Sequence, residues 1–241
     1  MLLIYNDNTN PYFNLAMEEY FLKNSTEDLF ILYRNEPSVI IGKNQKTLSI
    51  VNPDYINENS IPVVRRLSGG NALFNDLGNI NFAFITNSSS SYFKKLSLPI
   101  IDLFKTMGLN ATFSDKNDLL LDNKKFYRNT QYNYRNKIMH HGTLFFSSKI
   151  ANLSNALKVK NVNSRFTNIS EHLDNKMNIL EFKDLIINYI SSINPNNKIY
   201  NLTKDDINQI EKLVVNKYRT YNWNFGNDTE YRFTNELKYP G

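Results

Sequence analysis

The chain has 241 residues, enough for one large domain or two small ones, and its composition of 41% hydrophobic and 21% charged residues is ordinary for a globular protein. It contains no cysteine, which excludes disulfides, thiolate metal sites and a cysteine nucleophile. The formal net charge of +5 comes from scattered basic residues, so nothing demands a nucleic-acid partner. No apolar run is long enough for a membrane span and no signal peptide is visible, so we expect a cytoplasmic protein with no membrane or nucleic-acid partner.

Strands and helices are interspersed along the first half of the chain. A strand is predicted over residues 2–6, and a helix follows because Asn10 can cap it and Pro11 suits the first helical position. Strands are then predicted at residues 29–34, 39–42, 62–66, 73–74 and 80–85, with a short helix starting at residues 52–54. We expect the last two strands to form a hairpin-like continuation, and the apolar alternation in the last one predicts a single buried face.

The second half continues in the same mixed manner. A helix is predicted over residues 91–109, broken or started at Pro99. Strands are predicted at residues 119–121 and 139–146, and helices at residues 150–157, 180–193 and 205–218. This order predicts an α+β protein whose central sheet is mixed or mostly antiparallel and flanked by helices.

Three clusters carry the residue types of a ligand site. Two arginines, Arg65 and Arg66, precede a glycine turn, and arginine offers a fork of donors that suits carboxylate and phosphate oxygens. Glycine lets the backbone approach a ligand closely. The other two clusters are Asn117-Asp118 with Lys124-Lys125, and His140-His141-Gly142-Thr143-Leu144. Together they indicate a site that holds and activates an anionic organic molecule.

Several segments stand in an order and spacing that is specific as a set. They are Pro37–Gln45, Arg65–Asn79, Asn117-Asp118, Asp122–Lys125, His140–Leu144, Ser164–Asn168 and Trp223–Gly226. In this order they resemble the motifs of the lipoate–protein ligase family, whose lipoate-binding loop is written RRxSGGGAVYHDxGN. The resemblance covers nearly the whole chain.

The resemblance implies a biotin/lipoate protein ligase fold, related to class II synthetases, with residues 1–241 as a single catalytic domain that lacks the small C-terminal accessory domain of larger members. It also implies a two-step reaction that uses ATP, Mg²⁺ and lipoate. Lipoyl-AMP forms first, and a lysine of an acceptor lipoyl domain then takes the lipoyl group. The expected acceptors are the E2 subunits of 2-oxoacid dehydrogenases and the glycine cleavage H protein, and a separate chain could supply the accessory domain.

The resemblance also assigns roles to residues. Lys125 is the expected catalytic residue, which holds the carboxyl end of lipoate and the α-phosphate. The expected lipoate or lipoyl-AMP contacts are Arg66, Ser68, Gly69, Gly70, Asn71, Ala72, Asn75, His141, Gly142 and Thr143. The expected nucleotide contacts are Asn117, Asp118, Arg165 and Thr167, with Asp118 also a candidate Mg²⁺ ligand. We expect Leu73, Phe74, Phe82 and Phe84 to help line an apolar slot for the acyl chain.

The chain departs from the family pattern at the presumed site. The third loop glycine is Asn71 and the following histidine is Asn75. The serine-glycine pair after the lysine is replaced by Tyr127-Arg128, which changes volume and charge beside the presumed reaction centre. This pair could reshape the pocket, add a phosphate contact through the arginine, or reduce activity.

Two other functions stay open at this stage. The chain could be a transferase that needs preformed lipoyl-AMP or a partner chain, or a degenerate protein that binds lipoate or nucleotide without turnover. Octanoyl transfer through a cysteine thioester is excluded, because there is no cysteine.

Overall fold

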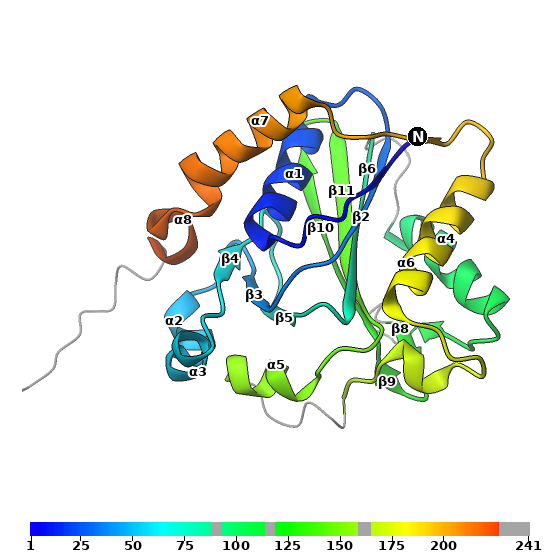
Figure 1. Ribbon diagram of the computed structural model, residues 1–241, viewed down its shortest axis with the longest axis horizontal. Helices are drawn as coiled ribbons and strands as arrows, with labels where there is room; N and C mark the ends of the chain where they lie inside the picture. The colour runs from blue at the N-terminus through cyan, green and yellow to red at the C-terminus, as the bar shows by residue number, and fades with distance from the viewer. Residues whose placement is uncertain (88–92, 114–118, 159–164, 227–241) are drawn as a thin grey trace, which may run out of the picture.

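The computed structural model describes residues 1–87, 93–113, 119–158 and 165–226. Within these ranges a six-stranded sheet forms the centre of the molecule (Figure 1). Its strands are β1 (Leu2–Tyr5), β2 (Leu29–Tyr33), β6 (Asn79–Asn87), β10 (Tyr127–Tyr134), β11 (Lys137–Phe145) and β12 (Lys198–Ile199), in the order β10-β11-β6-β2-β1-β12. Strand β1 is parallel to β2 and β12, and the other neighbours are antiparallel. The predicted α+β class with a mixed sheet is confirmed.

Both faces of the central sheet are buried. On β6, Phe82 and Phe84 belong to one core cluster, whereas Ala83 and Ile85 belong to the other. Helices α4 (Phe93–Thr106) and α6 (Ile179–Ser192) cover the first face, and α1 (Pro11–Asn24), α7 (Lys204–Leu213) and the π-helical segment η3 (Val214–Tyr218) cover the second (Figure 1). The prediction of one buried face was therefore wrong, because helices pack on both sides.

A second, smaller sheet carries the glycine loop. It contains β4 (Val63–Arg65), β3 (Ser38–Ile41) and β5 (Leu73–Asn75), with β3 in the middle. Because β5 pairs with β3 and not with β6, the expected hairpin of β5 and β6 is wrong. The loop between β4 and β5 is thus anchored at both ends in one sheet.

A third sheet carries Lys125, and short helices complete the described chain. The sheet has the order β7 (Thr112–Phe113), β8 (Leu119–Leu121) and β9 (Lys124–Lys125). The remaining helices are α2 (Thr47–Ile50), α3 (Pro53–Glu58), α5 (Ala151–Ala156), the 3₁₀ helix η2 (Ile169–His172) and α8 (Tyr221–Phe225).

Local sequence signals predicted the start of α1 correctly, but they misjudged Pro99 in α4 and missed strand β10. The side chain of Asn10 caps α1 by accepting from the backbone N–H groups of Tyr12 and Phe13, as predicted. Pro99 lies inside α4 and does not break it, and the apolar residues that follow it, Ile100, Ile101, Leu103 and Phe104, anchor the helix to the core. Strand β10 is missing from the prediction, because its sequence YRNTQYNY is polar and half-buried at an edge of the sheet.

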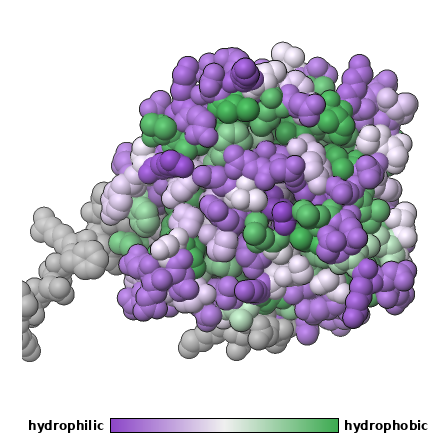
Figure 2. All heavy atoms as spheres, viewed as in Figure 1, coloured by the Kyte–Doolittle hydropathy of each residue, from purple (hydrophilic) through white to green (hydrophobic). Residues whose placement is uncertain are grey.

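The outer surface is largely hydrophilic. Figure 2 shows polar side chains over much of the visible face, with smaller apolar patches between them. In the described ranges, no helix combines the length and the apolar character that crossing a membrane would require.

His140 is expected to make folding depend on pH. Its ring is fully buried with Nε2 3.0 Å from the Tyr127 hydroxyl, and burial, with a smaller contribution from His141, lowers its pKa from 6.5 to about 3. The unfolded chain therefore binds a proton between these values that the folded chain does not. The free energy of unfolding therefore has its full value above pH 6.5. It falls as the pH drops from 6.5 toward about 3, by up to about 1.4 kcal/mol per pH unit.

Chemical denaturation of the wild type and His140→Gln at pH 7.5, 6.0 and 4.5 measures this effect. We expect the free energy of unfolding to fall less steeply for the variant, which still offers Tyr127 a hydrogen-bond partner. Parallel curves for the two proteins would contradict the prediction.

Candidate functional site

Arg65 holds the fold together behind the site. Its side chain is buried, and Nε and the terminal nitrogens donate to the backbone oxygens of Gly42, Lys43 and Gln45, to those of Trp223 and Asn224, and to Thr47 Oγ1, at 2.8–3.0 Å. This one guanidinium ties β4 to the turn after β3 and to α8. Its contacts are therefore structural.

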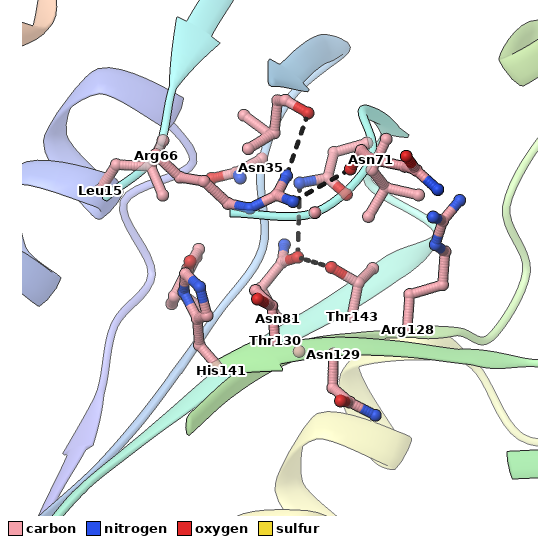
Figure 3. Close-up of a pocket in the computed structure, with 16 residues that line it drawn as sticks. Leu15, Asn35, Arg66, Asn71, Asn81, Arg128, Asn129, Thr130, His141 and Thr143 are labelled. Atoms are coloured by element: carbon pink, nitrogen blue, oxygen red, sulfur yellow. Dashed lines mark hydrogen bonds between the residues drawn. The ribbon is translucent and has the colours of Figure 1, made fainter. Parts of the chain in front are cut away.

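Arg66 is the centre of the glycine loop. Its Nε donates to Ser68 Oγ at 3.0 Å, and a terminal nitrogen donates to the backbone oxygen of Gly69 at 2.6 Å. Its terminal nitrogens also donate to the backbone oxygens of Asn71 at 3.0 Å and Ile40 at 3.4 Å (Figure 3). A buried cation requires such partners, so the loop backbone folds around the guanidinium. Arg66 holds the loop that borders the cavity, and it also lines that cavity.

Two glycines permit the close approach of two loops. A Cβ on Gly42 would lie 2.0 Å from the backbone oxygen of Gly70, and Gly70 itself has φ +88°. The left-handed conformation of the loop thus falls on Gly70 and not on Asn71, so an asparagine is accommodated where the family pattern has a third glycine.

A buried chain of hydrogen bonds links the loop to α1. Ser68 Oγ lies 2.6 Å from His141 Nε2, His141 Nδ1 lies 2.7 Å from Glu18 Oε2, and the Tyr33 hydroxyl donates to Glu18 Oε1 at 2.9 Å. Because the Glu18 carboxylate only accepts hydrogen bonds, it assigns the ring proton of a neutral His141 to Nδ1, and Nε2 then accepts from the Ser68 hydroxyl. Burial and the Glu18 carboxylate raise the pKa of Tyr33 well above its ordinary value, so Tyr33 stays a donor.

The first cavity lies between the glycine loop and the central sheet and has a volume of about 110 Å³ (Figure 3). Its walls combine apolar and neutral polar side chains with a histidine and two arginines. The lining residues are Leu15, Tyr33, Asn35, Ile40, Arg66, Gly70, Asn71, Leu73, Asn75, Asn81, Arg128, Asn129, Thr130, His141, Gly142 and Thr143. Of the four residues expected to line an apolar slot, only Leu73 does so, because Phe74, Phe82 and Phe84 pack in the core clusters.

The second cavity adjoins the first and contains Lys125, with a volume of about 340 Å³. It is lined by Gln45, Ile50, Asn71, Ala72, Lys125, Arg128, Leu153, Leu157, Arg165 and Phe166. The backbone of Lys125 pairs with the segment 165–167, since its N–H donates to the oxygen of Arg165 and its oxygen accepts from the N–H of Thr167. This pairing brings Arg165 and Lys125 to the same cavity.

Positive charge gathers where the two cavities meet. Asn71 and Arg128 line both of them, with Arg66 in the wall of the first cavity and Lys125 in the wall of the second. Burial lowers the pKa of Arg66 to about 10, and the neighbouring charge of Arg128 adds to this shift. No aspartate or glutamate is among the described residues that line either cavity. This arrangement favours a ligand with several negative charges.

Comparisons with known proteins show the family to which the chain belongs. A family model for the lipoyl protein ligase A/B catalytic domain matches residues 10–191. The lipoate-protein ligase LplJ of Bacillus subtilis is 39% identical, over 100% of this chain and 78% of that protein. Lipoate–protein ligase 1 of Staphylococcus aureus is 41% identical, over 99% of this chain and 77% of that protein. The chain belongs to the lipoate–protein ligase family.

Solved structures of lipoate–protein ligases share the fold. The bi-partite ligase of Thermoplasma acidophilum, described with its E2 lipoyl domain, matches with a TM-score of 0.83 at 24% identity, over 93% of this chain and 95% of that chain. Plasmodium falciparum LipL1 in complex with lipoate matches with a TM-score of 0.81 at 26% identity, over 93% of this chain and 74% of that chain.

The structure distributes the predicted site residues of this lipoate–protein ligase family member over the two cavities and their supports. Arg66, Gly70, Asn71, Asn75, His141, Gly142 and Thr143 line the first, and Asn71, Ala72, Lys125 and Arg165 line the second. Ser68 and Gly69 line neither cavity and accept hydrogen bonds from Arg66. Thr167 also lines neither cavity, and its hydroxyl contacts Glu171 and His172. Asn117 and Asp118 lie outside the described residues.

Some residues at the site were missing from the sequence prediction. They are Glu18 and Tyr33, which complete the chain from Ser68. Arg128, which the sequence analysis already considered as a phosphate contact, lines both cavities. The sequence does carry a signal for Glu18, because Glu18 and Glu19 stand between the apolar runs Leu15–Met17 and Tyr20–Leu22 of α1, and carboxylates are almost never buried without partners. For Tyr33 the sequence carries no signal beyond a buried strand.

Gly42→Ala should disturb the glycine loop although residue 42 lies outside it. The new Cβ meets the backbone oxygen of Gly70 at 2.0 Å, so one of the two loops must move. We expect a loss of about 1–3 kcal/mol in the free energy of unfolding and weaker lipoate binding, measured by denaturation and calorimetry.

Gly69→Ala is the matched control. A Cβ at Gly69 meets nothing within 4 Å, so we expect a change in unfolding free energy within about 0.5 kcal/mol. Equal behaviour of the two variants would contradict the proposed contact between the loops.

Proposed function

We propose that this chain is a lipoate–protein ligase that activates lipoate with ATP to lipoyl-AMP and transfers the lipoyl group to a lysine of an acceptor lipoyl domain, with residues 1–241 acting as one catalytic unit. The observation that carries the proposal is the pair of adjoining cavities that share Asn71 and Arg128. One is suited to an acyl chain and the other is lined by Lys125 and Arg165. Family membership supports the same chemistry.

The two cavities suit the two halves of the first step. Leu15, Tyr33, Ile40 and Leu73 give the first cavity apolar walls for the dithiolane and the aliphatic chain. The carboxylate would then point to the junction and the α-phosphate would approach from the side of Lys125. Fixed cations at that point reduce the repulsion between carboxylate and phosphate and stabilise the charge that develops in the transition state.

The described lining residues suit the phosphates of ATP, whereas they offer no cluster of ligands for Mg²⁺. The basic second cavity is suited to phosphate oxygens. In the described part of the chain, no three or more His, Cys, Asp or Glu residues form a cluster that could hold a metal. Mg²⁺ keeps several waters and takes few protein ligands, so Mg²⁺ bound to the ATP phosphates would need little from this chain and would neutralise part of the phosphate charge. Asp118 stays a predicted ligand, because it lies outside the described residues.

In the second step, the lysine amine of the acceptor attacks the acyl carbon of lipoyl-AMP. An amide bond forms, the bond to the phosphate oxygen breaks with its electron pair leaving on AMP, and the amine proton passes to solvent. The E2 subunits of 2-oxoacid dehydrogenases and the H protein are the acceptors that we propose. The cytoplasmic location expected from the sequence stays a prediction.

A second candidate function rests on Tyr127-Arg128. Because this pair replaces the serine-glycine of the family pattern beside Lys125, adenylation could be lost while transfer from preformed lipoyl-AMP is retained. Incubation of the pure protein with a lipoyl domain and either lipoate with Mg·ATP or preformed lipoyl-AMP separates the two. A gain of one lipoyl mass in both reactions supports the ligase, a gain only from lipoyl-AMP supports the transferase, and no gain in either contradicts both.

Lys125→Met should abolish the first step. Lys125 lines the second cavity and is half-buried, so we expect the loss of a fixed charge at the transition state to reduce lipoyl-AMP formation by about 100-fold or more. Release of pyrophosphate measures the effect.

Lys124→Met is the matched control, because Lys124 is the exposed neighbour on the same strand and lines neither cavity. We expect its rate to stay within about twofold of the wild type. A Lys125→Met rate equal to that of the control would remove Lys125 from the reaction.

A further inference from the structure

We infer that Asn35 and Asn81 form a hydrogen-bonding subsite at the end of the first cavity remote from Lys125, and that this subsite selects acyl groups whose tail carries a sulfur or oxygen atom over those that end in hydrocarbon. The inference rests on the proposed function and deepens it, because it names residues that would distinguish lipoate from octanoate. It depends on two buried amide groups that the proposed reaction does not use.

Two buried donors in the wall of the first cavity have no acceptor within the described chain. Asn35 and Asn81 line this cavity and are only 1% and 3% exposed. In the ranges that the structure describes, nothing accepts a hydrogen bond from the Nδ2 atom of either residue. A buried N–H group without an acceptor destabilises the protein, so an acceptor inside the cavity would be bound favourably.

The hydrogen bonds around Asn35 fix the direction of its amide. Asn14 Nδ2 donates to the backbone oxygens of Asn8 at 2.9 Å and Arg34 at 3.0 Å, which identifies this atom as the nitrogen. It also donates to Asn35 Oδ1 at 2.8 Å. Turning the Asn35 amide over would place two NH₂ groups against each other, so Nδ2 of Asn35 is the atom left for the cavity.

A series of amide groups fixes Asn81 in the same way. Asn79 Nδ2 donates to the backbone oxygen of Phe74 at 3.4 Å and to Asn75 Oδ1 at 3.2 Å. Asn75 Nδ2 then donates to Asn81 Oδ1 at 3.3 Å, and Thr143 Oγ1 donates to the same oxygen at 2.7 Å (Figure 3). Because Oδ1 of Asn81 takes both bonds, its Nδ2 is the atom that remains for a ligand.

The sheet register places these donors away from the reacting end. Successive partners on β10, β11, β6 and β2 form one row across the sheet, and they are Arg128, Thr143, Asn81 and Tyr33. Since neighbouring strands lie about 4.8 Å apart, Asn81 is about 10 Å along this row from Arg128. Asn35 follows the end of β2, beyond Tyr33. An acyl chain whose carboxylate lies where Arg128 lines both cavities therefore extends its tail toward Asn81 and Asn35.

The tail of lipoate suits this end of the cavity better than a plain hydrocarbon does. A dithiolane sulfur is a weak hydrogen-bond acceptor and a hydroxyl oxygen is a stronger one. The methyl end of octanoate accepts nothing, so both amide groups stay without a partner when it fills the cavity. A site built around buried polar groups discriminates against a ligand that leaves them unpaired.

Binding of lipoate, octanoate and ω-hydroxyoctanoate tests the inference, because the last two differ by one terminal oxygen. Calorimetry compares the wild type with Asn35→Leu and with Asn81→Leu, which keep a side chain of similar size and remove the donor. Asn14 retains its two backbone acceptors in Asn35→Leu, so we expect that variant to fold. Asn133→Leu is the control, because Asn133 is exposed on β10 and lines neither cavity. Thermal unfolding verifies that each variant is folded.

We expect the wild type to bind lipoate and ω-hydroxyoctanoate at least about tenfold more tightly than octanoate. A hydroxyl buried in an apolar cavity would weaken binding, so a gain from the added oxygen reports a hydrogen-bond partner. Asn35→Leu and Asn81→Leu should lose this preference by weakening the first two ligands and not octanoate. Asn133→Leu should behave as the wild type.

Weaker binding of ω-hydroxyoctanoate than of octanoate by the wild type overturns the inference, since the far end of the cavity is then apolar or its donors are satisfied by water. An unchanged preference in both cavity variants overturns it too, and so does an equal loss for all three ligands, which marks a packing role. A wild type that binds none of the three acids refutes the proposed function itself. Binding of lipoate without any preference over octanoate leaves the proposed function standing and removes the subsite alone.

Discussion

The glycine loop depends on one buried guanidinium. Arg66 donates to the backbone oxygens of Gly69 and Asn71 and to the hydroxyl of Ser68, so the loop closes on a cation that cannot be left without partners. Hydrogen bonds within the chain therefore hold this wall of the first cavity in place. The contact of Gly42 with Gly70 and the chain from Ser68 through His141 to Glu18 then attach this loop to β3 and α1. A site held from several elements keeps its donors fixed during reaction, which is the condition for electrostatic catalysis.

The two adjacent arginines before the glycine loop have different roles. Arg65 is the last residue of β4 and Arg66 follows it, and their side chains make separate sets of contacts. Arg65 binds carbonyl oxygens of the turn after β3 and of α8, more than 150 positions away for Asn224, whereas Arg66 turns to the cavity. A similar division separates Tyr127, which packs in the core, from Arg128, which lies at the junction. In both pairs, one of two adjacent residues supports the fold and the other lines a cavity.

Much of the fold could be predicted because its signals are local. The Asn10 cap, the buried strand β2 and the apolar stripe of α6 are each contained in a short stretch of sequence. Strand β10 could not be found in that way, because its pairing with β11 and not its composition makes it a strand. The site shows the same division. The order of the motifs indicated Arg66, Lys125 and His141 as site residues. It could not indicate that Arg66 supports the loop, because that role depends on the direction of the backbone carbonyl groups of Gly69 and Asn71.

The local charge of the site explains how one cavity pair can both attract and release its ligands. The chain as a whole carries only +5, yet Arg66, Arg128, Lys125 and Arg165 line two adjoining cavities whose described walls include no carboxylate. In the proposed reaction, the substrates are a carboxylate and a triphosphate, and the intermediate is still anionic, so each is held by this field. The amide formed in the second step carries no charge at the acyl end. The attraction that assembles the reactants therefore disappears from the acyl group once the product has formed, and the lipoyl chain can leave with its acceptor without any change in the conformation of the loop.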